Sequence, residues 1–119
     1  MARFMIVDDT KIFRRILRDL LENMGHTIAL EAKSGEEALE IYDHAAVDCV
    51  LLDVEMGGIS GIETLKELKE RHSDVKVIMV SSVSEANRLK EAAMSGAAMA
   101  VQKPIKAEAL FAAIKQVIG

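Results

Sequence analysis

Residues 47–53 read VDCVLLD, and this stretch decides the fold. It is a nearly all-apolar run that ends at Asp53, and such a run is typical of a strand covered on both faces. A second run of this kind, KVIMV, follows at 76–80. Strands with two apolar faces belong to parallel sheets that have helices packed on either side. The sequence therefore predicts an α/β fold.

Strand and helix patterns alternate along the whole chain. Short apolar runs predict strands over 3–7, 27–32, 47–52, 76–80 and 98–102, of which 27–32 alternates like an edge strand. Three-to-four spacing, capping pairs and glycine stops predict helices over 11–24, from Ser34 through 42, from Ser60 onward, over 84–94 and over 106–118. Five strands alternating with five helices predict one doubly wound (βα)5 domain over residues 1–119, with the flavodoxin-like strand order 2-1-3-4-5.

The same spacing predicts which helix faces point to the core. In the first helix these residues are Ile12, Phe13, Ile16, Leu17, Leu20, Leu21 and Met24. In the last helix they are Leu110, Phe111, Ile114, Val117 and Ile118. The fourth helix is rich in alanine, so Leu89 and Met94 are its expected anchors. The pairs Ser34/Glu37 and Ser60/Glu63 are predicted capping boxes.

Composition narrows the class of protein. The chain has 119 residues, half of them hydrophobic, which suits one domain with its own core. A net charge of −4 argues against a nucleic-acid partner, which usually needs a basic patch. A lone Cys49 excludes an intrachain disulfide and fits a reducing compartment. With no apolar stretch long enough to span a bilayer and no signal-peptide pattern, we expect a cytoplasmic protein without membrane insertion.

Polar residues gather at the ends of the predicted strands. The first strand is followed by Asp8 and Asp9, the third by Asp53, the fourth by Ser81 and Ser82, and the fifth by Lys103. Ligands of open parallel sheets bind at this edge. Clustered acids repel one another, and Mg²⁺ relieves that repulsion with the oxygen ligands it prefers. One carboxylate can then act as a nucleophile, while the lysine and a serine hydroxyl contact the phosphoryl oxygens. These groups predict phosphoryl transfer to a carboxylate.

Each of these residues also has an ordinary structural interpretation. Asp9 is well placed to cap the helix that begins at Lys11, Asp53 alone reads as a loop acid, and Lys103 alone reads as a solvated lysine. Only their joint placement at successive strand ends is specific. We expect Asp9 to do both jobs, helping to start the helix and facing a metal ion.

Four short motifs carry a family resemblance. IVDDT, LLDVEM, VSS and QKP, in this order and spacing, resemble the receiver domains of two-component response regulators. The resemblance spans the whole chain and is closest to stand-alone, chemotaxis-type (CheY-like) members. It implies a signalling protein rather than an enzyme. Such a protein accepts a phosphoryl group from a histidine kinase or phosphotransfer protein, binds a downstream protein target, and slowly dephosphorylates itself.

The resemblance also implies roles for the acids. Asp53 would be the phosphoacceptor. Asp9 and Asp53 would supply carboxylates to Mg²⁺, or to Mn²⁺ in its place. Asp8 would act largely through water, and the backbone carbonyl of Glu55 would be a further ligand.

For the remaining strand ends, the resemblance implies phosphoryl binding and signal output. Ser81 would move toward the phosphoryl group, the backbone N–H of Ser82 would help to bind it, and Lys103 would pair with its oxygens. The Lys103–Pro104 peptide bond is expected to be cis. The output face would lie on the fourth helix, fifth strand and fifth helix, and would include Arg88, Lys90, Glu91, Met99, Ala100, Gln102 and Lys106.

Two positions depart from the family pattern. Met56 is followed by Gly57 and Gly58 instead of proline, so we expect a more flexible loop. Ala100 stands where the family commonly has tyrosine or phenylalanine. A switch based on rotation of an aromatic side chain cannot operate with alanine, so the signal must leave through backbone or loop shifts.

The site residues are also compatible with two other functions. An aspartate-nucleophile phosphatase of the haloacid-dehalogenase kind uses similar groups, but it places its nucleophile first, in a DxD pattern, and carries a cap domain. A pseudo-receiver would bind partners without phosphorylation, and Ala100 is its only support.

Overall fold

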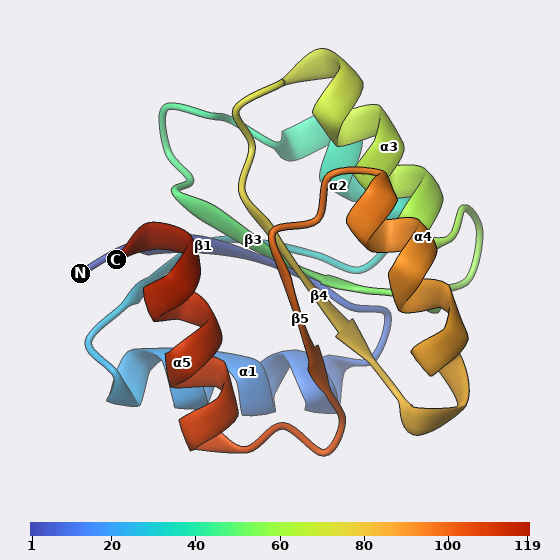
Figure 1. Ribbon diagram of the computed structural model, residues 1–119. Helices are drawn as coiled ribbons and strands as arrows, with labels where there is room; N and C mark the ends of the chain where they lie inside the picture. The colour runs from blue at the N-terminus through green and yellow to red at the C-terminus, as the bar shows by residue number, and fades with distance from the viewer.

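The predicted apolar runs form one parallel sheet in the order β2-β1-β3-β4-β5 (Figure 1). The computed structural model describes all of residues 1–119. Its strands are β1 (Arg3–Val7), β2 (Thr27–Ala32), β3 (Cys49–Asp53), β4 (Val77–Ser81) and β5 (Met99–Gln102). All five residues of β3 and of β4 are buried, whereas most of β2 and β5 is not. The α/β class, the strand order and the edge position of β2 are therefore confirmed.

Helices cover both faces of the sheet. They are α1 (Lys11–Asn23), α2 (Gly35–Ile41), α3 (Gly61–Arg71), α4 (Leu89–Met94) and α5 (Ala107–Ile118), with a 3-10 helix, η1 (Val83–Arg88), before α4. Figure 1 shows α1 and α5 on one side of the sheet and α2, α3 and α4 on the other. Because strand side chains alternate between faces, Phe4 and Ile6 pack toward α1 and α5, while Met5 and Val7 pack toward α2 and α3.

Some of the predicted inward residues lie on the surface. Ile12 is 78% exposed and Ile16 is 43% exposed, so their assignment to the core is wrong. Phe111 of α5 is also exposed, with the Lys115 ammonium 5.7 Å from its ring centroid. The apolar residues of these helices extend beyond the one stripe that contacts the sheet, and the residues on its flank remain in solvent.

The region predicted as one helix over 84–94 has two parts. It begins as the 3-10 helix η1, in which Glu85 is the one buried residue, and becomes α-helical only at Leu89. Met94 is 81% exposed and is not an anchor, whereas Ala92 is buried and Leu89 is half-buried against the core. With so little apolar surface to bury, the first part of this segment depends on polar contacts.

The two predicted capping pairs differ in the structure. Ser60 and Glu63 form the complete reciprocal box at the start of α3. At α2, the Ser34 hydroxyl accepts the Glu37 N–H, but the Glu37 carboxylate accepts the N–H of Lys33 instead of that of Ser34. At α2 the predicted capping box is therefore incomplete, because the carboxylate of Glu37 binds the backbone one residue before the N-cap.

The backbone at the start of α3 packs closely against the backbone at the end of β3. The N–H of Gly61 donates to the Val54 carbonyl oxygen at 2.9 Å. A Cβ at position 61 would lie 1.9 Å from the backbone carbonyl oxygen of Asp53, a distance that no relaxed structure contains. Glycine is required here because helix and strand backbones approach so closely.

Substitution Gly61→Ala should therefore destabilise the fold by about 2 kcal/mol or more, because backbone atoms would have to move apart. Urea unfolding of both proteins measures the change. Gly57→Ala is the matched control, since no atom lies within 4 Å of a Cβ built there. Equal unfolding midpoints for the two variants would contradict the packing described.

Candidate functional site

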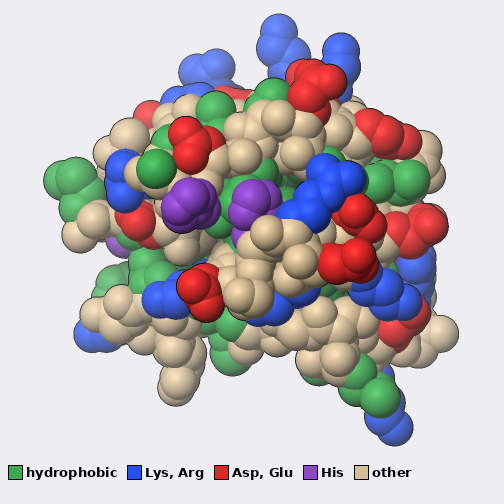
Figure 2. Space-filling model, turned by 90° about the horizontal axis from the view of Figure 1, so that it is seen from above, with side chains coloured by type: hydrophobic (Ala, Val, Ile, Leu, Met, Phe, Trp, Pro, Cys, Tyr) green, Lys and Arg blue, Asp and Glu red, His purple; other side chains and the backbone are tan.

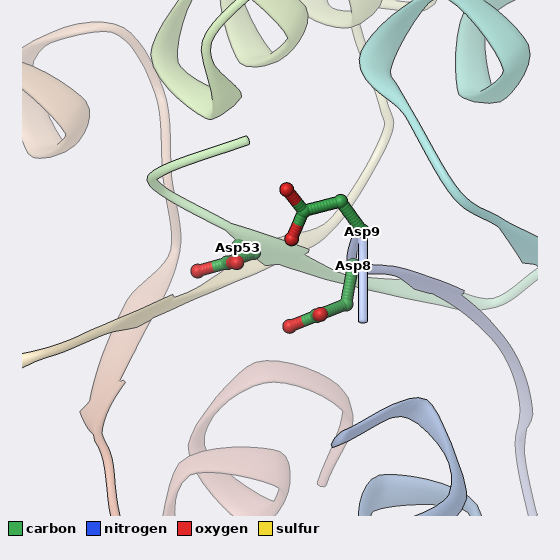
Figure 3. Close-up of side chains that lie close together, drawn as sticks. All are labelled: Asp8, Asp9 and Asp53. Carbon is green, nitrogen blue, oxygen red and sulfur yellow. The ribbon is translucent and has the colours of Figure 1, made fainter. Parts of the chain in front are cut away.

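Three aspartates meet at the carboxyl ends of the neighbouring strands β1 and β3. Asp53 is the last residue of β3, and Asp8 and Asp9 directly follow β1. Each side chain places one carboxylate oxygen within 4.8 Å of the other two. Figure 3 shows the three side chains gathered around one space at this edge of the sheet. The fold thus brings together the acids that the sequence places at separate strand ends.

Asp8, rather than Asp9, makes the local hydrogen bonds before α1. One oxygen of Asp8 accepts both the backbone N–H and the hydroxyl of Thr10, each at 2.8 Å. The Arg14 guanidinium donates to the Asp8 carbonyl oxygen at 2.6 Å. The exposed Asp9 carboxylate instead accepts the backbone N–H of Gly57 at 3.3 Å. The expectation that Asp9 helps to start α1 is therefore wrong, because Asp8 makes the contacts to the backbone that precedes the helix.

Lys103 brings the positive charge of the site. Its ammonium lies 3.4 Å from a carboxylate oxygen of Asp53 and 3.6 Å from one of Asp8. The same ammonium lies 4.3 Å from the centroid of the Phe13 ring, which supports it from the α1 side. The peptide bond between Lys103 and Pro104 is cis.

Three buried oxygens at this edge have no hydrogen-bond partner. They are Asp8 Oδ2, Asp53 Oδ1 and Ser81 Oγ. Both distances to Lys103 are longer than an ordinary hydrogen bond, so its charge compensates these carboxylates only partly. Buried polar atoms are normally satisfied. Orphaned carboxylate oxygens beside a third acid are a donor set that fits a hard divalent cation.

The surroundings of Asp53 disfavour its charge. Burial is the largest cause and the charge of Asp8 is the second; together they outweigh Lys103 and raise the pKa of Asp53 to about 7. A carboxylate with this pKa holds a proton in part at neutral pH until a cation compensates it.

Glu85 is a residue of this site that the sequence reasoning missed. It is buried, and its carboxylate accepts the backbone N–H of Ser82 at 2.8 Å. Burial opposes its charge, but the hydrogen bond donated by Ser82 and the charge of Lys103 help to outweigh burial, and the pKa of Glu85 is lowered. Ser82 and Glu85 have the Ser-x-x-Glu spacing of the two predicted capping pairs, so a signal for this contact was present. The Ser82 N–H assigned to phosphoryl binding is thus already hydrogen-bonded.

The loop after β3 is held from several sides. Met56 is buried, and the Glu36 carboxylate of α2 accepts the N–H of Ile59 at 3.2 Å. The side chain of Glu55 lies 3.7 Å from the Arg88 guanidinium of η1. The loop that carries the predicted carbonyl ligand is therefore linked to both η1 and α2.

The residues predicted as an output face are only partly together. A hollow of about 700 Å³ beside β5 and α5 is lined by Met99, Ala100, Gln102 and Lys106. Arg88 faces Glu55 instead, and Glu91 pairs with Lys66 of α3 at 2.9 Å. Lys90 is exposed on α4 and does not line the hollow.

No other group of side chains offers a comparable cation site. The three aspartates are the one group of three or more His, Cys, Asp or Glu residues whose ligand atoms converge. Figure 2 shows two histidine side chains close together on the face that it draws, where acidic and basic side chains are interspersed. The ring centroids of His44 and His72 are 6.4 Å apart, but these two residues are not part of a converging group of three possible metal ligands. None of the helices combines the length and apolar character needed to cross a bilayer.

A family model, curated sequences and solved structures all match this chain to proteins of one family. The model of the response regulator receiver domain family matches residues 4–115. The chain is 31% identical to the chemotaxis protein CheY of Bacillus subtilis, with 98% of each chain covered, and 34% identical to that of Halobacterium salinarum, with 96% of this chain and 94% of the other covered. Its structure is similar to a CheX–CheY–BeF3–Mg²⁺ complex from Borrelia burgdorferi, with a TM-score of 0.90 and 27% identity, over 95% of this chain and 86% of the other.

The raised pKa of Asp53 predicts how stability depends on pH without metal. The folded state binds the proton more tightly than the unfolded state, whose Asp53 titrates near 3.8. The free energy by which this proton stabilises the folded state is therefore fully present below about pH 4, and it is lost as the pH rises through about 7. Urea unfolding in chelator, at steps of pH, should show the parent losing stability relative to Asp53→Asn across that window. Parallel profiles for the two proteins would contradict the shift.

Proposed function

The chain belongs to the response regulator receiver domain family, and from this premise we propose that it is a two-component receiver switched by phosphorylation of Asp53. The observation that carries the proposal is the set of orphaned, buried oxygens on Asp8, Asp53 and Ser81 beside Lys103. A purely structural cluster has no need to leave these atoms unpaired. A phosphoryl group with its cation would satisfy all three.

In the proposed reaction, a carboxylate oxygen of Asp53 attacks the phosphorus of a phosphohistidine. The new O–P bond forms while the P–N bond breaks, and its electron pair stays on the imidazole nitrogen. Lys103 already lies 3.4 Å from Asp53 and neutralises the transferred oxygens, and the unpaired Ser81 hydroxyl donates a hydrogen bond to one of them. Slow hydrolysis of the acyl phosphate by water resets the protein, so it is a switch rather than an enzyme that turns over a substrate.

The donor set at this edge suits Mg²⁺, with Mn²⁺ as a substitute. Asp9 and Asp53 would hold it directly, Asp8 through water, and Glu55 through its backbone carbonyl. When bound, the cation offsets the charge of the phosphoryl oxygens and of the clustered acids. Asp9 is the exposed acid of the three, which leaves the site accessible from solvent.

The proposed partners are a histidine kinase or phosphotransfer protein and a downstream protein target, in the cytoplasm. The CheY of Borrelia burgdorferi forms a complex with CheX in the presence of BeF3 and Mg²⁺, which supports a phosphoryl-dependent protein partner by analogy. The hollow lined by Met99, Ala100, Gln102 and Lys106 is the surface we assign to the target. If phosphorylation left target affinity unchanged, the pseudo-receiver interpretation would hold instead.

Millimolar Mg²⁺ should raise the melting temperature, because a cation that binds only the folded state stabilises it. At ten times its dissociation constant the gain is about 1.4 kcal/mol, or several degrees for a domain of this size. Differential scanning fluorimetry measures the shift. Asp9→Ala should reduce it strongly, whereas Asp19→Ala, which removes an exposed acid of α1, should not. A flat Mg²⁺ titration of the parent protein would refute the metal site.

Acetyl phosphate with Mg²⁺ should add one phosphoryl group to the parent chain, because it presents a reactive phosphorus to the same nucleophile. Intact-mass analysis detects the addition. Asp53→Asn should gain no mass, Lys103→Ala should be phosphorylated at least about tenfold more slowly since a charge-assisted contact is lost, and Asp19→Asn should behave like the parent. An undiminished mass gain in Asp53→Asn would exclude this phosphoacceptor.

A further inference from the structure

One charged side chain is buried outside the aspartate cluster. The buried charged residues of the chain are Asp8, Asp53 and Glu85. The first two meet at the acid site, and Glu85 belongs to η1, where it is the one residue withdrawn from solvent. A buried carboxylate is costly unless hydrogen bonds hold it. The position of Glu85 therefore calls for a specific explanation.

The principal hydrogen bond of Glu85 comes from an amide of the phosphoryl site. Its carboxylate accepts the N–H of Ser82 at 2.8 Å, a distance typical of strong, charge-assisted bonds. Ser82 directly follows Ser81, the last residue of β4, and the paired strands place Asp53 opposite Val80. Any phosphoryl oxygen that takes the Ser82 N–H must take it from Glu85, because one amide has one proton to donate.

We propose that Glu85 is the internal competitor of the phosphoryl group. It holds the Ser82 amide in the unphosphorylated protein and gives it up when Asp53 is phosphorylated. This inference rests on the proposed phosphorylation of Asp53. Charge favours the exchange: a phosphoryl dianion draws Lys103 and the Ser82 amide toward itself, and it repels the Glu85 carboxylate. Glu85 is thus a positioning residue for the reaction rather than a participant in it.

Release of Glu85 would also move the segment that follows. The other polar side-chain contacts of η1 and α4 lie near the surface: Arg88 lies 3.7 Å from Glu55, Lys66 pairs with Glu91, and the Ser84 hydroxyl lies 2.9 Å from that of Ser82. The apolar contacts come from α4, where Ala92 is buried and Leu89 is half-buried. Exposed ion pairs contribute little to stability. The partly buried bond to Ser82 is therefore a large part of what holds η1 in place, and its loss converts a charge at Asp53 into displacement of residues 83–94.

The central test compares Glu85→Ala and Glu85→Gln with the parent, using acetyl phosphate and Mg²⁺ and following intact mass. Removing the competitor frees the Ser82 amide, so Glu85→Ala should be phosphorylated roughly three- to tenfold faster. Glu85→Gln keeps an oxygen that can accept the amide but lacks the charge, so it should lie between Glu85→Ala and the parent. Glu108→Ala, which removes an exposed acid from the first turn of α5, should match the parent.

Amide and carboxyl NMR signals of the parent provide a second readout that needs no variant to fold. On phosphorylation, the Glu85 side-chain carboxyl and the Ser82 amide should both shift, together with amides over 83–94. Unchanged Glu85 signals in a protein whose Asp53 is phosphorylated, or parental rates in both variants, would overturn this inference and leave the proposed function standing. Failure of the parent to accept a phosphoryl group would overturn both.

Discussion

The burial of two aspartates side by side is the constraint on which the rest of this structure depends. Asp8 is inaccessible to solvent and Asp53 is 3% exposed, and like charges in such surroundings repel each other strongly. Lys103 offsets part of that repulsion from a distance of 3.4 Å or more. The strands that end at these acids are packed on both faces, so the carboxylates cannot move apart. The free energy of core packing therefore holds together a cluster of carboxylate oxygens, two of which have no hydrogen-bond partner in the protein.

Sequence predicted the fold well because buried parallel strands are short, apolar and regularly spaced. The runs that end at Asp53 and Ser81 appear in the structure as fully buried strands, with bounds that differ by one or two residues.

The faces of the helices that contact the core were harder to predict. A helix with apolar residues on more than one stripe can rest on the sheet in several orientations, and neighbour packing chooses among them. Ile12 and Phe111 were assigned to the core for this reason, although both are largely exposed.

The candidate site was predictable to the extent that it depends on topology. The carboxyl ends of parallel strands meet at one edge, so the convergence of Asp8, Asp9 and Asp53 followed from the strand assignment. Which of two adjacent acids contacts the helix start depended on backbone geometry, and Asp8 makes those bonds. Glu85 was missed because the helix was predicted to begin near Ser84, although Ser82 and Glu85 have the spacing of the capping box that the structure shows.

The residues at positions 85 and 100 bear on how a change at Asp53 could be transmitted to other parts of the fold. Ala100 borders a hollow of about 700 Å³, so its side chain is too small to transmit a rotation by packing against its neighbours. A phosphoryl group acts first on charges, and the charge of Lys103 acts to lower the pKa of both Asp53 and the buried Glu85. Glu85 is also bonded to the amide next to Ser81, at the start of η1, in which no apolar side chain is buried. The route that we propose through η1 is electrostatic and needs no large side chain on β5.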